Sequence, residues 1–473
     1  MFLLHQIGGS YGVTNPGQLS WLVAGYSLTV GTFILFSGRL GDAFGYKLML
    51  LIGLSWFSIW SMVAGLAVYS NYVLFVFSRV FQGIGPAIAL PNALAIFGAS
   101  YPPGHRKAMV FSFFGASAPV GAMVGTVIGS VLELAWWPWV LWALSITLAI
   151  ITVVGYFVIP SPPRKTVLTL DLRTLVTELD IAGAVVGCTG LVVFNFAWNQ
   201  APLAGWDAPE VIATLVIGLV LLGAFFYIEA KWAKRPLLPF DAVNADVAFV
   251  LGAVACGWAT FGVWTLYFLQ ILQQIRHLSP LLSSAWFSPV AIAGVIAAVA
   301  TGKLLGPLKT PPPVVMTMAL LAFAVGDILA ATAPVHQVYW AQTFVSVIIM
   351  PFGMDMSFPA ATLILSDAVK KEHQGIAASL VNTVVNYGIS LGVGFAGTVE
   401  VHVNNGGRTE EDLLKGFRGA LYLGIGLAGL GLVICLAFLE KEYRRRRKQT
   451  GKTKQENIEG GSTTPATDFE LSE

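Results

Sequence analysis

Long apolar segments recur along the whole chain, and the short stretches between them hold most of the charged side chains. A helix that crosses a bilayer needs about 17–25 predominantly apolar residues. Each of these segments is about that long or longer, so the pattern predicts an all-α integral membrane protein. We predict thirteen transmembrane helices, at residues 18–40, 48–69, 72–98, 108–132, 138–159, 180–200, 209–230, 245–271, 279–301, 313–333, 337–365, 374–399 and 417–440.

Basic residues divide unevenly between the two sides of the membrane when these spans are alternated. The turn at residues 38–47 carries Arg39 and Lys47, and most of the 27 Lys and Arg residues fall on its side. Loops on the cytoplasmic side are the ones enriched in Lys and Arg. We therefore expect this turn and the C-terminus in the cytoplasm and the N-terminus outside. The plasma membrane is the expected location, with the vacuole as the alternative.

The chain changes character after Glu440. The segment "KEYRRRRK" at 441–448 is a juxtamembrane basic cluster of the kind that binds anionic lipid. The residues that follow are polar and rich in Gly, Ser and Thr. We expect residues 441–473 to form a disordered cytoplasmic tail that is first basic and then polar.

Charged side chains are scarce within the spans. They make up 11% of the chain, whereas apolar residues make up 56%. A charge inside the bilayer is costly and usually functional. Three such charges, Arg79, Asp327 and Asp355, lie well inside predicted spans. No set of metal ligands and no nucleophile–base set falls within the spans, so we expect neither an enzyme nor a cofactor, and no nucleic-acid partner.

Asp355 occupies the middle of the span 337–365, between Pro351 and Pro359. Each proline is four residues away, which places all three residues near one helix face. Prolines remove backbone donors and loosen a helix, and this is tolerated where the helix lines a cavity within the protein. An acid on such a helix suits the loading and release of a proton. The alternative is a structural acid that is hydrogen-bonded to polar neighbours.

Arg79 is the cation of the span 72–98, and Gln82 and Pro86 follow it. We expect it to face a cavity, where it would stabilise a charged carboxylate or bind an anionic group. The alternative is a side chain that extends toward the outer surface or bonds to a backbone carbonyl. Asp327 lies nearer the outer end of its helix, and we expect it in a water-filled vestibule.

Uncharged polar side chains also cluster within the spans. Asn195 lies on the span 180–200, and Asn382 and Asn386 follow at helical spacing on the span 374–399. Together with Gln82 they are candidates for lining a substrate cavity. The alternative is that they form hydrogen bonds between helices and hold the helices together.

Several segments of the chain resemble the signatures of a known family. "GRLGDAFGYK" resembles the loop signature of the major facilitator superfamily in Gly38, Leu40, Gly41, Asp42, Gly45 and Lys47. "RVFQGIG" resembles a signature of the drug:proton antiporters in Arg79, Gln82, Gly83 and Gly85. "GASAPVGAMVG" is similar to a further antiporter signature, but loosely, mainly in Pro119. Other stretches resemble the fungal fourteen-span branch related to aminotriazole- and boron-resistance transporters.

The resemblance implies two helical halves around a central cavity with two helices inserted between them. Because the chain has thirteen predicted spans and its signature turn follows the first of them, the family's first helix is expected to be absent. The expected parts are a remnant of that helix with its outer loop at 1–17, a first half of five helices at 18–159, a cytoplasmic linker at 160–179, the inserted pair at 180–230, a second half of six helices at 231–440 and the tail at 441–473.

The resemblance also implies proton-coupled export of small organic compounds such as drugs, toxins or secondary metabolites. Asp355 and Arg79 would couple the proton, and Asp42 would accept bonds at the start of the next helix within a cytoplasmic gate. The gate residues would be Gly38, Arg39, Asp42, Gly45 and Lys47, and the helix-bending residues Pro86, Pro119, Pro351 and Pro359.

The partners expected from this interpretation are a small substrate, protons and the bilayer, with the proton gradient as driving force and a monomer as the working unit. One alternative is an exporter of a small inorganic solute such as borate or ammonium. Another is a transport-dead, truncated product or a membrane receptor.

Overall fold

Helices make up nearly all of the computed structural model, which describes residues 3–13, 16–101, 105–160, 179–233, 236–237, 245–368 and 374–460 and has no strand within them. The elements are α1 (Leu4–Ser10), α2 (Pro16–Phe44), α3 (Tyr46–Leu66), the 3-10 turn η1 (Ala67–Tyr69), α4 (Tyr72–Ser100), α5 (His105–Glu133), α6 (Pro138–Val158), α8 (Ile181–Ala204), α9 (Pro209–Lys231), α10 (Ala245–Gln270), the π-helical turn η3 (Ile271–Ile275), α11 (Pro280–Phe287), α12 (Pro289–Leu305), α13 (Pro312–Thr332), α14 (Gln342–Ala368), α15 (Gln374–Val403) and α16 (Glu410–Gly460).

The predicted membrane architecture is confirmed. Twelve helices in the described part of the chain are long and apolar enough to cross a bilayer. The remaining predicted span, 108–132, coincides with α5, whose described apolar part, 117–133, is shorter. The span predicted at 279–301 is divided into α11 and α12 at Ser288. Pro289 explains this division, because proline has no backbone N–H and is accepted in the first turn of a new helix.

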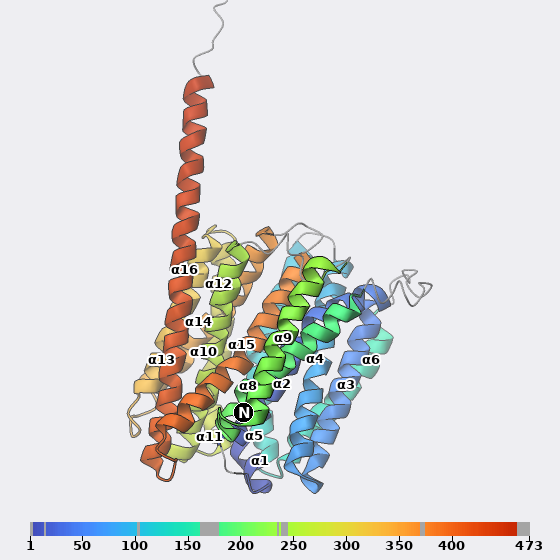
Figure 1. Cartoon of the computed structure of the whole chain (residues 1–473), viewed down its shortest axis with the longest axis vertical. Helices are drawn as coiled ribbons and strands as arrows, with labels where there is room; N and C mark the ends of the chain where they lie inside the picture. The colour runs from blue at the N-terminus through green and yellow to red at the C-terminus, as the bar shows by residue number, and fades with distance from the viewer. Residues whose placement is uncertain are drawn as a thin grey trace, which may run out of the picture.

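The helices form two groups with an inserted pair between them (Figure 1). α2, α3 and α4 pack with one another, α6 packs against α3, and α10, α13, α14, α15 and α16 pack with one another. α8 packs along α9 and also contacts α2 and α15, so the inserted pair covers the place where these two helices meet. We call α2–α6 the first half and α10–α16 the second half.

Two contact lines join the halves. The first, which we call the α2–α15 seam, is close enough that a Cβ added to Gly31 would lie 2.7 Å from the backbone N of Tyr387. The second, the α5–α12 seam, brings α5 against α11 and α12. At this second seam Ser130 Oγ and Ser284 Oγ are 2.5 Å apart. The two halves thus meet along two separate helix contacts, one between α2 and α15 and the other between α5 and α12.

α16 continues well beyond the bundle, which corrects the expectation of disorder from residue 441. It remains helical to Gly460, while residues 461–473 lie outside the described residues. The segment favours a helix because it is rich in Glu, Lys, Arg and Gln and lacks proline. Glu440 also pairs with Arg444 one turn later, at 2.6 Å.

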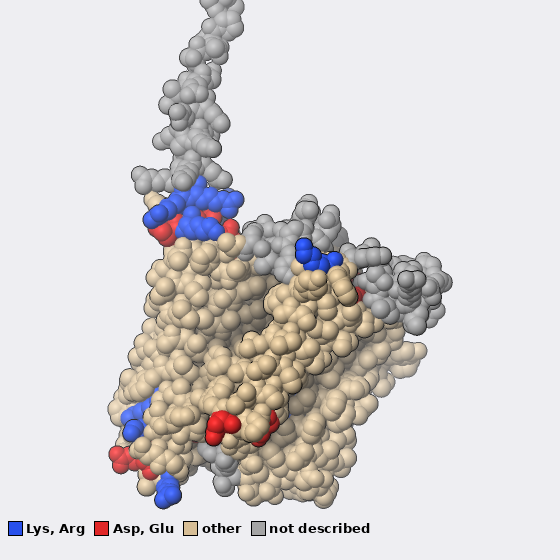
Figure 2. Space-filling view, viewed as in Figure 1, with Lys and Arg blue, Asp and Glu red and all other residues tan. Residues whose placement is uncertain are grey.

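The end at which α16 leaves the bundle is called the tail side below. Figure 2 shows Lys and Arg gathered around α16 there, and a wide band without charged side chains below them. Such a band is expected where acyl chains surround the protein.

Candidate functional site

Asp355 lies on α14, which continues as one helix through Pro351 and Pro359. Its backbone carbonyl accepts a hydrogen bond from Thr301 Oγ1 of α12, at 3.3 Å. Its carboxylate oxygen Oδ2 is buried without a hydrogen-bond partner, and no cation pairs with it among the described residues. A buried carboxylate without compensation is costly when charged. Oδ2 therefore lacks the polar partners that the alternative, a structural acid bonded to its neighbours, would require.

Pro119 and Gly294 bring the two halves together beside this carboxylate. A Cβ added to Gly294 would lie 2.6 Å from Pro119 Cβ and 2.9 Å from Asp355 Oδ2. Only glycine therefore fits at this position of α12 without a shift of its neighbours. Asp355 is consequently placed on the α5–α12 seam, next to the proline of the loosely matching segment.

Arg79 is held entirely within the first half. Its guanidinium donates to Gln82 Oε1 and, at 3.2 Å, to the backbone carbonyl of Leu22. It also lies over the ring of Tyr26, 4.9 Å from the ring centroid, which is within cation–π range. Gln82 in turn donates to Ser61 Oγ at 2.6 Å. These contacts hold Arg79 through polar groups of α2, α3 and α4.

The structure does not bring Arg79 and Asp355 together. Within the described residues Arg79 has no carboxylate partner. It lines a cavity of about 140 Å³ between α1, α2, α4 and α6 whose other lining side chains are apolar. Gln82 is fully buried and does not line this cavity. Coupling between Arg79 and Asp355 therefore stays a prediction.

Asn195 and its neighbour Asn199 form hydrogen bonds that join α8 to α15. Both are fully buried. Asn195 Oδ1 accepts from Asn199 Nδ2 at 2.8 Å and from Ser390 Oγ of α15 at 2.9 Å. Ser390 Oγ is also 3.1 Å from the carbonyl of Ala24 on α2, to which it can donate. These contacts are of the kind that the alternative interpretation describes, and they connect α8 to the α2–α15 seam.

Asn382 and Asn386 are placed differently, because both are only partly buried on α15. Asn386 Nδ2 donates to the carbonyl of Asn382 at 3.0 Å. The Cβ of Asn386 lies close to Gly31 of α2, so this residue faces the first half across the seam. Of the predicted cavity-lining residues, these two are the ones that are only partly buried on α15, and Asn386 lies beside Gly31 of the first half.

The signature turn is a contact point between distant segments. α2 runs to Phe44, and Gly45, with φ 99°, is the only residue between it and α3. The guanidinium of Arg39 donates to the carbonyl of Pro236, in the segment that leads to the second half. Lys47 Nζ donates to the carbonyl of Tyr156 on α6, at 2.8 Å.

Asp42 departs from its expected role in this turn. No side chain caps the N-terminus of α3, and Asp42 Oδ1 accepts instead from the hydroxyl of Tyr46 at 2.5 Å. The reason is the extension of α2 through Phe44, which leaves Asp42 on a helix four residues before Tyr46. Gly38 lies next to Ser379 of α15, so the turn also touches the tail-side part of the α2–α15 seam.

Asp327 does not lie in a water-filled vestibule. It is fully buried, and neither carboxylate oxygen has a hydrogen-bond partner. The expectation was wrong because α16 packs against α13 at Gly424, where the missing Cβ leaves room only for the Asp327 carboxylate.

Glu400 was not expected among the buried charges. It is nearly inaccessible, and Tyr267 OH donates to its Oε2 at 2.9 Å. The apolar pattern ended the span at residue 399, whereas α15 continues to Val403. The signal that could have revealed Glu400 is the apolar sequence "VEV" on either side of it, which continues the helix.

Comparison with known proteins decides the family. The model of the Major Facilitator Superfamily matches residues 1–393 and 309–469. The chain belongs to this superfamily. The fold is also that of the nucleoside transporter NupG, whose crystal structure covers 93% of this chain and is itself covered to 95%, with a TM-score of 0.62 at 13% identity.

Fungal relatives place the chain in the drug-resistance branch of the superfamily. A low affinity ammonium transporter of Saccharomyces cerevisiae is 55% identical and covers 94% of this chain, which spans 85% of the relative. The efflux pump terJ of Aspergillus terreus is 48% identical, with coverages of 94% and 84%. The aminotriazole resistance protein of Saccharomyces cerevisiae is 39% identical, with coverages of 94% and 81%. The chain is therefore a multi-pass transporter of the membrane.

Replacement of Asn195 by alanine separates a role in helix packing from a role in substrate binding. Asn195→Ala removes the acceptor of two hydrogen bonds, so we expect a loss of about 1–3 kcal/mol in the stability of the purified protein. Asn386→Ala, on accessible surface, should leave stability within about 0.5 kcal/mol. Thermal unfolding in detergent measures both. Unchanged stability of Asn195→Ala together with a raised KM would contradict the packing role.

Proposed function

We propose that this transporter exports small organic compounds in exchange for protons, by alternating access of its two halves. The tail side is proposed to face the cytoplasm, as the distribution of Lys and Arg favours. Asp355 is proposed as the proton carrier. Support comes from the efflux-pump relative and from one structural observation: Asp355 is half-buried on the α5–α12 seam, and its carboxylate oxygen Oδ2 is buried there without a hydrogen-bond partner.

The location of Asp355 supplies a reason for coupling. A charged carboxylate is costly at an apolar contact between helices, so the closed seam favours the protonated form. Loss of the proton would favour a conformation in which the seam opens to water. A proton would thus bias the equilibrium between two arrangements of the halves, which is the requirement for coupled transport.

Arg79 and the signature turn take subordinate roles in this proposal. Arg39 holds the first half to the segment before the second half, and Lys47 holds α3 to α6 within the first half. These contacts are proposed to act as a gate on the tail side. Arg79 is proposed to face substrate through the cavity that it lines, and its link to Asp355 would require another conformation.

Asp355→Asn tests the proton carrier in vesicles that contain the purified protein, with aminotriazole as the first probe. A gradient of one pH unit drives about tenfold accumulation if one proton exchanges per substrate. We expect the variant to lose this accumulation because asparagine cannot exchange a proton. Exchange of labelled for unlabelled probe at equal pH should persist, since it needs no net proton movement.

Asp327→Asn is the matched control for this experiment. It makes the same change at a fully buried acid whose carboxylate oxygens also lack hydrogen-bond partners, but away from the α5–α12 seam. The control should keep gradient-driven accumulation. Accumulation by Asp355→Asn at the level of the parent protein would exclude Asp355 as the carrier.

Ammonium is the second candidate substrate, because the ammonium transporter is the relative with 55% identity. In this case the partly exposed Asn382 and Asn386 would contact the solute. Their carbonyl groups are acceptors for the donors of an ammonium ion.

Competition in the same vesicles separates the two candidates. If ammonium is the substrate, millimolar ammonium should reduce probe transport by the intact protein, and Asn386→Ala should weaken that inhibition about threefold or more, as expected for one lost hydrogen bond. Transport of aminotriazole that is insensitive to ammonium would contradict the ammonium proposal. Transport of neither compound would favour a receptor.

A further inference from the structure

A cluster of basic side chains surrounds α16 where it leaves the bundle. Residues 440–448 include six basic and two acidic side chains. The side chains described within this segment include Lys441, Arg444 and Arg445, all exposed, which we call the basic collar. Figure 2 shows this positive group directly above the uncharged band.

The collar lies at the depth of the lipid headgroups. On α16 the lipid-facing side chains Val433 and Leu436 are 63% and 49% exposed, as suits contact with acyl chains. Lys441 follows Leu436 by five residues, a rise of about 7 Å along the helix. Tyr443, 64% exposed, is an aromatic residue of the type enriched at this interface. The collar therefore begins where the hydrocarbon layer ends.

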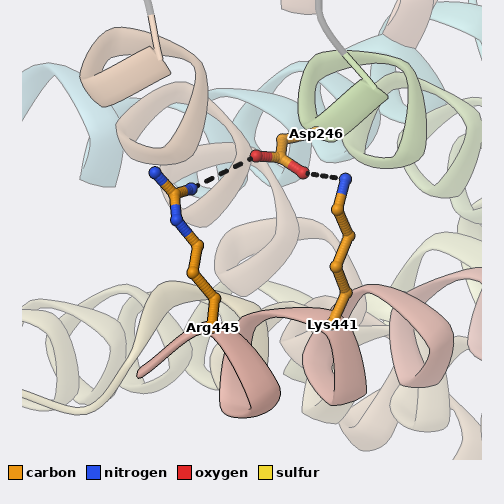
Figure 3. A network of polar contacts seen from close by, with 3 residues as sticks. All are labelled: Asp246, Lys441 and Arg445. Atoms are coloured by element: carbon orange, nitrogen blue, oxygen red, sulfur yellow. Dashed lines mark hydrogen bonds and ion pairs between the residues drawn. The ribbon is translucent and has the colours of Figure 1, made fainter. Parts of the chain in front are cut away.

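Asp246 already contacts two cations of the collar (Figure 3). It lies in the first turn of α10, the first helix of the second half. Its Oδ1 is 2.7 Å from Lys441 Nζ, and its Oδ2 is 3.7 Å from Arg445 Nη1. Lys441 Nζ also lies over the ring of Phe249, 5.5 Å from the centroid. These contacts join the first and last helices of the second half.

The two cations remain accessible while they face this carboxylate. Their side chains are 49% and 63% exposed, whereas Asp246 is 25% exposed. Arg444 differs, because it pairs with Glu440 on its own helix. A phosphate group from the bilayer can thus approach Lys441 and Arg445 from the lipid side and replace the carboxylate as their counterion.

We propose that the basic collar binds the headgroups of anionic phospholipids in the tail-side leaflet, in competition with Asp246. Binding releases α16 from the start of α10. The site is built by Lys441 and Arg445, which are one helical turn apart and lean toward the same carboxylate (Figure 3). The proposal depends on the membrane setting and not on the transported substrate.

Lipid binding to the full-length protein in detergent tests the site, with phosphatidylserine and phosphatidylcholine as probes and native mass spectrometry as the measurement. Lys441→Gln combined with Arg445→Gln should weaken phosphatidylserine binding about tenfold or more, because each basic residue near the surface contributes about 1 kcal/mol. Arg408→Gln combined with Lys415→Gln, also exposed but near the opposite end of α16, should leave binding unchanged.

Asp246→Asn distinguishes competition from simple attraction. Removal of the competing carboxylate should strengthen phosphatidylserine binding about threefold or more. Weaker or unchanged binding in this variant would overturn the competition, and full binding by the collar variant would overturn the site. Glycerophosphoserine, the headgroup without acyl chains, should bind poorly. Equal binding of this compound would overturn a lipid ligand in favour of a free phosphate ester.

Discussion

An uncompensated carboxylate at the contact between the two halves is the constraint on which the functional account depends. Asp355 Oδ2 is buried beside Gly294, and Pro119 of the first half reaches the same point. The seam tolerates this acid at low cost only while it is neutral. Closure of the seam and occupancy of the proton site are therefore linked. The glycine on α12 and the proline on α5 both lie at this one contact.

The inserted pair of helices acts on the opposite seam. Asn195 bonds to Asn199 and Ser390, and Ser390 bonds to the backbone of α2, so one buried network contacts the first half, the insert and the second half. A hydrogen-bonded polar group buried among helices costs free energy when its partners are removed. The two seams thus differ: the α2–α15 seam is joined by hydrogen bonds between buried polar side chains, and the α5–α12 seam holds a carboxylate oxygen without a hydrogen-bond partner.

The positions of twelve of the thirteen spans could be predicted, because an apolar stretch of bilayer length is a local property of the sequence. The turn with the family signature could also be recognised from the sequence, by its residues from Gly38 to Lys47. Contacts between segments far apart in the sequence could not be predicted. The burial of Asp327 depends on Gly424, and the hydrogen bonds of Asn195 depend on Ser390. The helical tail was missed because polar composition alone does not separate a solvated helix from disorder.

Cross-linking of the α5–α12 seam tests alternating access most directly. Ser130→Cys and Ser284→Cys, in a chain whose three native cysteines are replaced, would place two thiols where two hydroxyl oxygens are now 2.5 Å apart. The account predicts that oxidation stops transport in vesicles and that reduction restores it, because the halves have to separate there. Transport at the same rate with the disulfide formed would contradict it.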